Sequence, residues 1–147
     1  MSAADVAKLR EETGAGMMDV KRALDSAGGD YEQAKKNLMD AGLAKAAKKG
    51  DRVAGAGYLE AYIHAGRIGV LLEIFAETDF VTRDDTFRAA AKNVAMQISA
   101  TAPETVEALL AQPYLRDETM TVEQYLKTVI AKVGENIKIS RFTRYQL

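Results

Sequence analysis

Apolar residues follow two different spacings along the chain, and the change falls near residue 50. Before this point, apolar positions recur every three or four residues, which is the period of an amphipathic helix. After it, between residues 57 and 77, they alternate with polar positions, which is typical of β-strands. The pattern therefore predicts a helical N-terminal region, followed by a region that mixes strands and helices.

Three short helices are predicted in residues 1–42. Each apolar stripe stops at a glycine, the residue that most often follows a helix end. The predicted helices begin after Ser2, at Met17 or Met18, and after Asp30, and they end before Gly14, Gly28 and Gly42. Three helices of this length bury little apolar area, so we expect a module of marginal stability.

Two antiparallel strands are predicted in residues 57–77, "GYLEAYIHAGRIGVLLEIFAE", around the turn "AGRIG". Leu71 and Phe75 make the second strand apolar on both faces, as expected of a central strand. The first strand alternates tyrosine, glutamate and histidine with Leu59, Ala61 and Ile63.

Two longer amphipathic helices and a last strand are predicted after residue 85. The first helix runs from Thr86 to about Ala100 and cannot continue past Pro103, and the second ends at Gly134. The final stretch "NIKISRFTRYQL" alternates except at Phe142, which indicates a bulge or a shared edge. Helices segregated to one side of a small antiparallel sheet define an α+β fold.

The composition is that of an ordinary soluble globular protein, with 48% hydrophobic and 28% charged residues. The 20 basic and 21 acidic residues give a net charge of -1, whereas proteins that bind nucleic acid usually have a basic excess. No apolar run approaches the roughly 20 residues that cross a bilayer. The stretch "MSAADVAKLREETGAG" lacks the features of a secretory signal. We therefore expect a cytoplasmic protein that binds neither nucleic acid nor membranes.

Residues 43–55 join the two regions and are basic. Their positive charges are Lys45, Lys48, Lys49 and Arg52. A basic tract suggests nucleic-acid binding, but it is also typical of a solvated linker or of a helix end whose lysines complement the helix dipole. Four charges without interleaved aromatic residues are a weak indication of nucleic-acid binding. We favour a linker between a three-helix domain, residues 1–42, and an α+β domain, residues 56–147.

Catalytic and metal-binding patterns are scarce. The absence of cysteine excludes disulfides, cysteine-ligated zinc and thiol catalysis. The one histidine, His64, lies on a predicted strand, where a surface or packing role is more common than catalysis. The motif "TGAG" at residues 13–16 follows a helix and lacks the ending of a phosphate-binding loop. Glu77, Asp84 and Asp85 could gather a metal ion, but Thr82-Arg83-Asp84-Asp85 also fits an N-capping pattern with acids in the first helical turn. We favour capping, and expect neither an enzyme nor a metal or cofactor site.

Two features suit the binding of another protein. Met17 and Met18 are adjacent at a helix start, near Arg10 and Lys21, and methionine adapts well to an apolar partner surface. Alternatively they fill the three-helix core, although two adjacent helix positions rarely both point inward. Phe80 stands among acidic residues in "FAETDFVTRDDTF". It either returns to the core or is exposed as the aromatic anchor of an interface.

Five segments of the chain, taken together and in order, form a recognisable pattern. They are "LREETGAGMMDVKRAL" (9–24), "KAAKK" (45–49), "GVLLE" (69–73), "ETDFV" (77–81) and "IAKVGENIKISRF" (130–142). In this order they resemble the translation elongation factor Ts family. The resemblance implies a guanine-nucleotide exchange factor for elongation factor Tu that supports translation elongation. It also implies a ubiquitin-associated-like N-terminal domain, an α+β core and no covalent catalysis.

The resemblance implies a role for the segment around Phe80. This aromatic residue of the T-D-F motif would be a wedge between helices of elongation factor Tu, near its magnesium and phosphate site. Asp79 would seat the wedge by polar contacts, and Thr78 and Val81 would complete the binding surface. The partner would then lose its hold on Mg²⁺ and the β-phosphate, and GDP would leave.

The resemblance also implies that the N-terminal domain docks on another helix of the same partner domain. The matching residues are Arg10, Met17, Met18 and Lys21. Such a factor meets elongation factor Tu in its GDP-bound and its nucleotide-free form. It promotes release only if it binds the nucleotide-free form better.

The chain resembles the short form of the family, which has one core half and pairs as a homodimer. Some short relatives have a cysteine in the final "RF-x-R" motif, but this chain has Thr143, so we expect a non-covalent homodimer. Two alternatives remain: an RNA-binding adaptor that uses residues 43–52, and a ubiquitin-associated-like module without exchange activity. The salt dependence of binding tests the first, and GDP release tests the second.

Overall fold

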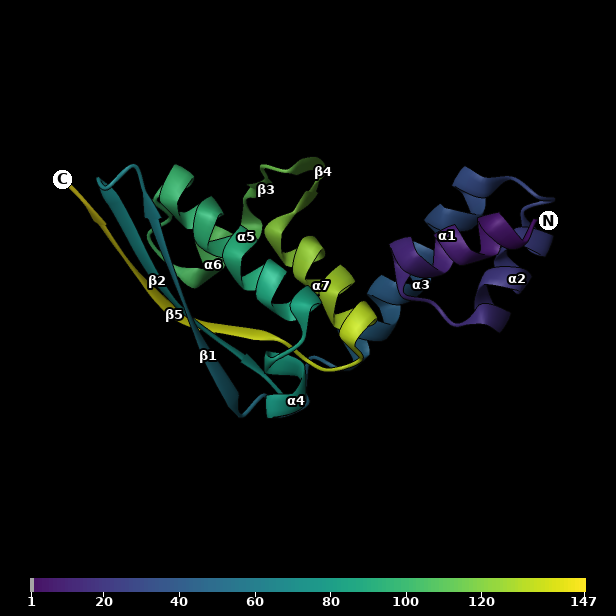
Figure 1. Cartoon of the computed structure of the whole chain (residues 1–147), viewed down its shortest axis with the longest axis horizontal. Coiled ribbons are helices and arrows are strands. Elements are labelled where there is room, and N and C mark those ends of the chain that lie inside the picture. Colours follow the sequence, from purple (N-terminus) through teal and green to yellow (C-terminus); the bar gives the residue numbers. More distant parts are fainter. Residues whose placement is uncertain (1) are drawn as a thin grey trace.

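The computed structural model describes residues 2–147 and shows two parts joined by a long helix (Figure 1). Helices alone form the N-terminal part, and a small antiparallel sheet with helices against it forms the other. This segregation confirms the predicted α+β fold. The elements are α1 (Ala3–Thr13), α2 (Met17–Ser26), α3 (Tyr31–Lys48), β1 (Ala56–His64), β2 (Ile68–Ala76), α4 (Asp79–Thr82), α5 (Asp85–Thr101), α6 (Val106–Ala111), β3 (Pro113–Tyr114), β4 (Asp117–Thr121), α7 (Val122–Val133) and β5 (Lys138–Gln146).

Side-chain caps account for the starts of α1 and α3. The Ser2 hydroxyl accepts a hydrogen bond from the Asp5 N–H at 3.0 Å, and the Asp30 carboxylate accepts one from the Gln33 N–H at 3.1 Å. Gly14 ends α1 in the left-handed conformation, with φ 70°, and "TGAG" forms the turn between α1 and α2. The helices enclose a small core of Val6, Leu9, Val20, Leu24, Ala34 and Leu38.

The predicted end of the third helix at Gly42 is wrong, because α3 continues to Lys48. Packing against α7 explains the difference. A Cβ atom at Gly42 would lie 3.3 Å from the Ala131 Cβ of α7, so the missing side chain allows the two helices to approach closely. This contact offsets the low helix propensity of glycine. Further along α3, Ala46 is buried in the core of the sheet part, so α3 belongs to both hydrophobic cores.

The sheet has the strand order β1-β2-β5, and all its pairs are antiparallel. β2 is central, as its two apolar faces predict, and a register shift between Glu73 and Ile74 places Phe142 out of phase. Helices α5, α6 and α7 lie on one side of the sheet (Figure 1), where α5 packs across β1 and β2. Leu72, Ile74 and Phe87 are fully buried between these layers.

The opposite side of the sheet, the outer face, is apolar and exposed. Leu59, Ala61 and Ile63 of β1 face this side, whereas Tyr58 and Tyr62 pack against the helix-covered core. The exposed fractions on the outer face are 60% for Leu59, 66% for Ile63, 45% for Leu71 and 76% for Tyr145. One ion pair crosses it, between Arg141 and Glu73 at 3.1 Å.

The connection between α5 and α7 contains α6 and the short β3–β4 pair, which the apolar pattern did not predict. A buried side chain of α5 organises this segment. The Gln97 amide group donates to the side chain of Gln112 at 2.9 Å and to the carbonyl of Pro113 at 3.1 Å. Its oxygen accepts from the Leu115 N–H at 3.0 Å. The shape of this connection thus depends on tertiary contacts rather than on local periodicity.

Candidate protein-binding site

Phe80 is exposed, so the ring does not return to the core. It lies on α4, a single helical turn, and 85% of its surface is accessible. The next two residues are buried, with Val81 at 5% and Thr82 at 7%. One side of the turn is therefore inserted into the core while the aromatic ring is held outward. Val81, which the family resemblance places in the binding surface, is buried on the inner side of the turn.

Glu135 holds the beginning of α4. The Thr78 N–H donates to Glu135 Oε1 at 2.9 Å, and the Thr78 hydroxyl donates to Glu135 Oε2 at 2.8 Å. The same hydroxyl oxygen accepts from the Val81 N–H at 3.4 Å and caps the turn. An isolated turn of helix is unstable in water, so these contacts define its orientation.

Asn136 joins three segments of the chain. Its backbone N–H donates to Glu77 Oε1 at 2.8 Å. Its side-chain amide donates to the carbonyl oxygens of Gly50 at 3.3 Å and Arg52 at 2.8 Å, which follow the end of α3. Only 3% of Asn136 is exposed, and a buried amide of this kind is stable because its donors are satisfied.

The acidic residues after Phe80 have a structural role. The Asp84 carboxylate accepts from the N–H groups of Thr86 at 2.8 Å and Phe87 at 3.3 Å, so Asp84 caps α5, whereas Thr82 ends α4. Within residues 2–147, no three acidic or histidine side chains gather in a way that would hold a metal ion. Asp79 is exposed beside Phe80 and is available as a hydrogen-bond acceptor.

Met17 and Met18 are also exposed, by 47% and 64%, and neither belongs to the three-helix core. Arg10 on α1 and Lys21 on α2 are exposed as well. Lys21 follows the methionines by one helical turn, so these three side chains share a face of α2. The expected contact residues therefore form two separate groups, one at the start of α2 and one on α4.

The basic tract after Gly42 lies partly on α3 and is partly neutralised. Lys45 and Lys48 stand in the last turn of α3, where positive charge complements the helix dipole. The Lys45 Nζ lies 3.9 Å from a carboxylate oxygen of Asp19, and the Arg52 guanidinium lies 3.7 Å from Glu77. These pairs favour the structural interpretation of the tract.

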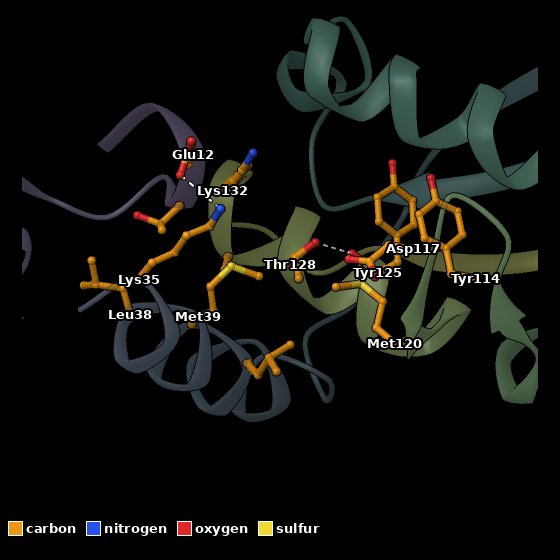
Figure 2. A pocket seen from close by; sticks show the side chains of 14 residues that line it. Glu12, Lys35, Leu38, Met39, Tyr114, Asp117, Met120, Tyr125, Thr128 and Lys132 are labelled. Atoms are coloured by element: carbon orange, nitrogen blue, oxygen red, sulfur yellow. Dashed lines mark hydrogen bonds and ion pairs between the residues drawn. The ribbon is translucent and has the colours of Figure 1, made fainter. Parts of the chain in front are cut away.

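A groove of about 480 Å³ separates the N-terminal helices from the core (Figure 2). Met39 on α3 and Met120 on β4 lie along it, and the rings of Tyr114 and Tyr125 stack at one end with their centroids 4.1 Å apart. The groove is lined by thioethers, aromatic rings and a few charged groups.

The acidic group at the other end of this groove is not suited to proton transfer. The Glu12 carboxylate accepts from Lys35 Nζ at 3.1 Å and from the Tyr31 hydroxyl at 2.9 Å. These two contacts hold the pKa of Glu12 below its usual range. A carboxylate stabilised in its charged form is a weak base at neutral pH. Glu12 therefore joins α1 to α3 and is poorly suited to act as a general base.

Glu135 and Asn136 could not be recognised from the sequence as residues that hold α4. Their contacts with Thr78 and Glu77 span 57 and 59 residues of sequence. The motif "GEN" after α7 does mark the end of a helix, because Gly134 has a positive φ of 78°. Nothing in the local pattern indicates which distant segment these two polar side chains contact.

The structure is thus a two-part α+β protein that exposes two separate groups of apolar side chains, one at the start of α2 and one on α4. None of the helices within residues 2–147 is long and apolar enough to span a membrane. Residues 77–147 match the family described as "Elongation factor TS".

Relatives with that name match the whole chain. It is 40% identical over 193 aligned positions to elongation factor Ts of Desulforamulus reducens, which covers all of this chain and 89% of the relative. It is 42% identical over 188 positions to the protein of Carboxydothermus hydrogenoformans, with 97% and 87% covered. The chain therefore belongs to the elongation factor Ts family. It is also 49% identical over 148 positions to elongation factor Ts of a Nostoc species, but spans only 47% of that protein's length.

Proposed function

We propose that this protein is a guanine-nucleotide exchange factor that binds elongation factor Tu, promotes GDP release and so supports translation elongation in the cytoplasm. The observation that carries the proposal is Phe80, an aromatic ring 85% exposed on a turn that is fixed to the core. An exposed aromatic side chain on a rigid support is suited to insertion into a partner, because little conformational entropy is lost on binding.

In the proposed mechanism, Phe80 enters between helices of elongation factor Tu near its magnesium and phosphate site. The factor accelerates release only if it binds the nucleotide-free form more tightly than the GDP-bound form. The ring supplies this difference if it is buried only in the opened form, since a phenylalanine buries roughly 150–250 Å². Thr78 and Asp79 flank the ring and orient it. Every step is a binding step, so the protein acts without covalent catalysis.

The N-terminal group forms the second contact in this proposal. Arg10 and Lys21 provide positive charge around the adaptable side chains of Met17 and Met18. In Figure 1, the loop that enters α2 and the helix α4 both lie along the lower margin of the molecule, so one partner can reach both. We assign this contact to a ubiquitin-associated-like domain, residues 1–42, connected by residues 43–55 to the core, residues 56–147.

The outer face of the sheet supports a further part of the proposal, a non-covalent homodimer. Leu59, Ile63, Leu71 and Tyr145 are exposed there on neighbouring strands. Apolar side chains grouped in this way are stabilised when a second surface excludes water from them. A second copy presents the same surface, and a two-fold axis would bring the two outer faces together.

The test is release of a fluorescent GDP analogue from elongation factor Tu. We expect the release rate to rise with the concentration of this protein and to depend weakly on salt, because an apolar wedge drives it. Binding without acceleration would favour a ubiquitin-associated-like adaptor. A steep loss of binding with salt would favour contacts with phosphate groups, as in an RNA-binding adaptor.

A further inference from the structure

The exposed ring of Phe80 is not held in place by its own packing. With 85% of its surface accessible, it makes few contacts with the rest of the chain. The helix that carries it has only four residues, too few to be stable alone. The direction of the ring must therefore be set by groups that hold the backbone of α4.

The geometry of Glu135 is suited to this task. Its two carboxylate oxygens accept from the N–H and the hydroxyl of Thr78, at 2.9 and 2.8 Å. The hydroxyl hydrogen is thereby directed at Glu135, which leaves an oxygen lone pair for the Val81 N–H, 3.4 Å away. One carboxylate thus fixes both the position of Thr78 and the cap of α4. Hydrogen bonds of this kind are stronger than neutral ones, because the acceptor is charged.

Asn136 extends the same arrangement to the N-terminal helices. Through its amide it contacts the carbonyl oxygens of Gly50 and Arg52, just after α3, and through its N–H it contacts Glu77, just before Thr78. α3 is a continuous helix from Tyr31 to Lys48 that also packs on α7. A chain of contacts therefore connects the domain carrying Met17 and Met18 to the turn carrying Phe80.

We infer that Glu135 and Asn136 are positioning residues, which fix the direction of Phe80 and its placement relative to the N-terminal domain. The role of this positioning in nucleotide exchange rests on the proposed function. Its physical reason is preorganisation: a ring already held in its binding direction loses less freedom when a partner engages it. If Glu135 is removed, α4 becomes mobile, and that freedom is then lost on binding.

A direct test uses the mobility of the turn and needs no partner. The chain contains no tryptophan, so Phe80→Trp introduces one tryptophan at an exposed position, and it can be excited selectively over the six tyrosines. We expect Glu135→Ala to increase fast local rotation of this fluorophore in time-resolved anisotropy, while far-UV circular dichroism is unchanged. Glu135→Gln should have an intermediate effect, because an NH₂ donor then replaces one of the two carboxylate oxygens that accept from Thr78.

Glu118→Ala is the matched control. Glu118 is exposed on β4, and its carboxylate forms no hydrogen bond or ion pair within the part of the chain that the structure describes. The control should leave the anisotropy decay unchanged. An unchanged decay in Glu135→Ala would overturn the inference.

A second test measures GDP release from elongation factor Tu. Glu135→Ala should slow the stimulated release by roughly 5- to 30-fold, the cost of ordering the turn on binding. If Glu135 acts only through Phe80, the double variant Phe80→Ala/Glu135→Ala should be no slower than Phe80→Ala alone. Effects that multiply would show that Glu135 contacts the partner itself, and would contradict a positioning role.

The two tests separate the inference from the proposed function. If Phe80→Ala leaves stimulated release unchanged while the anisotropy test succeeds, the exchange mechanism fails and the positioning role stands. If Phe80→Ala slows release but Glu135→Ala changes neither release nor anisotropy, the mechanism stands and the positioning role fails.

Discussion

Phe80 follows an apolar strand, and a phenylalanine at such a place usually returns to the core. Here α4 assigns the inward positions to Val81 and Thr82 and leaves the ring outside. The ring therefore contributes little to folding, and in the proposed function it acts only when a partner is bound. Substitution of Phe80 can therefore be compared with substitution of a buried phenylalanine by its effect on the free energy of unfolding.

We expect Phe80→Ala to change the free energy of unfolding by no more than about 0.5 kcal/mol, as for other exposed substitutions. Phe87→Ala is the control, because Phe87 is fully buried between α5 and the sheet. It should cost roughly 3–5 kcal/mol. Denaturant titration of both variants measures this. A Phe80→Ala protein destabilised as much as the control would show that the ring is packed in solution.

We expect Glu12 to make the stability of the N-terminal helices depend on pH in the acidic range. Lys35 and Tyr31 lower the pKa of Glu12 in the folded state, so its contribution to stability is present above the ordinary glutamate pKa and is lost as pH falls through the lowered value. Burial and the contact with Glu12 raise the pKa of Tyr31 to about 12. The contribution of the neutral Tyr31 hydroxyl to stability is therefore present below the ordinary tyrosine pKa, and it is lost as pH rises through about 12.

Thermal unfolding, monitored by circular dichroism, tests the predicted direction of the pH dependence that Glu12 causes. Glu12→Gln should lower the unfolding temperature at pH 7, where the carboxylate is charged, and have a smaller effect at pH 3. Asp40→Asn, a substitution of an exposed acidic residue on α3, is the control and should change little at either pH. An equal effect of Glu12→Gln at both values would contradict the assignment.

At the scale of elements, α3 is the connection on which the arrangement of the two parts depends. Gly42 faces Ala131 of α7, where an added Cβ would lie only 3.3 Å away. We expect Gly42→Leu to force α3 away from α7 and to cost about 1–3 kcal/mol by overpacking. Ala44→Leu, at an exposed position two residues further along α3, should be nearly neutral. Equal stability of the two variants in denaturant titration would show that α3 does not pack closely on α7.

Elements with strong local signals could be predicted from the sequence. Helix starts at Ser2, Asp30 and Asp84 follow from their capping side chains, and the central position of β2 follows from its two apolar faces. The extension of α3 past Gly42 could not be predicted, because it depends on contact with α7. The α6 and β3–β4 segments follow from hydrogen bonds to Gln97, a residue on another element.

The candidate site could be predicted only in part. Phe80 could be recognised because an aromatic residue among acids is unusual. The adjacent methionines could be recognised because two neighbouring helix positions cannot readily both point inward. The inward direction of Val81 depends on how α4 leaves β2, which the strand pattern does not specify. The contacts of Glu135 depend on bringing together residues 57 positions apart in the sequence.

At the scale of the whole molecule, the division into two domains predicts independent folding of the core. We expect a fragment of residues 43–147 to fold cooperatively, because it retains Ala46 in the core and the Gly50 and Arg52 partners of Asn136. It should bind elongation factor Tu more weakly in calorimetry, since Met17 and Met18 are removed. Unchanged affinity would show that the N-terminal group makes no contact with this partner.

The proposed homodimer places the outer face of the sheet between two copies. Leu71→Lys should shift sedimentation at micromolar concentration towards the monomer, because a charge would be buried between the outer faces. Leu115→Lys is the control, at a residue that is 48% exposed between β3 and β4. A wild-type protein that sediments only as a monomer would contradict the homodimer.

The wedge mechanism is tested most directly by GDP release with the Phe80→Ala protein. Release of a fluorescent GDP analogue from elongation factor Tu should be accelerated by the wild-type protein. It should be slower by well over tenfold with Phe80→Ala, because an aromatic anchor contributes about 2 kcal/mol or more at an interface. The unfolding curve of the variant should match that of the wild type. A folded Phe80→Ala protein that stimulates release as fast as the wild type would contradict the wedge.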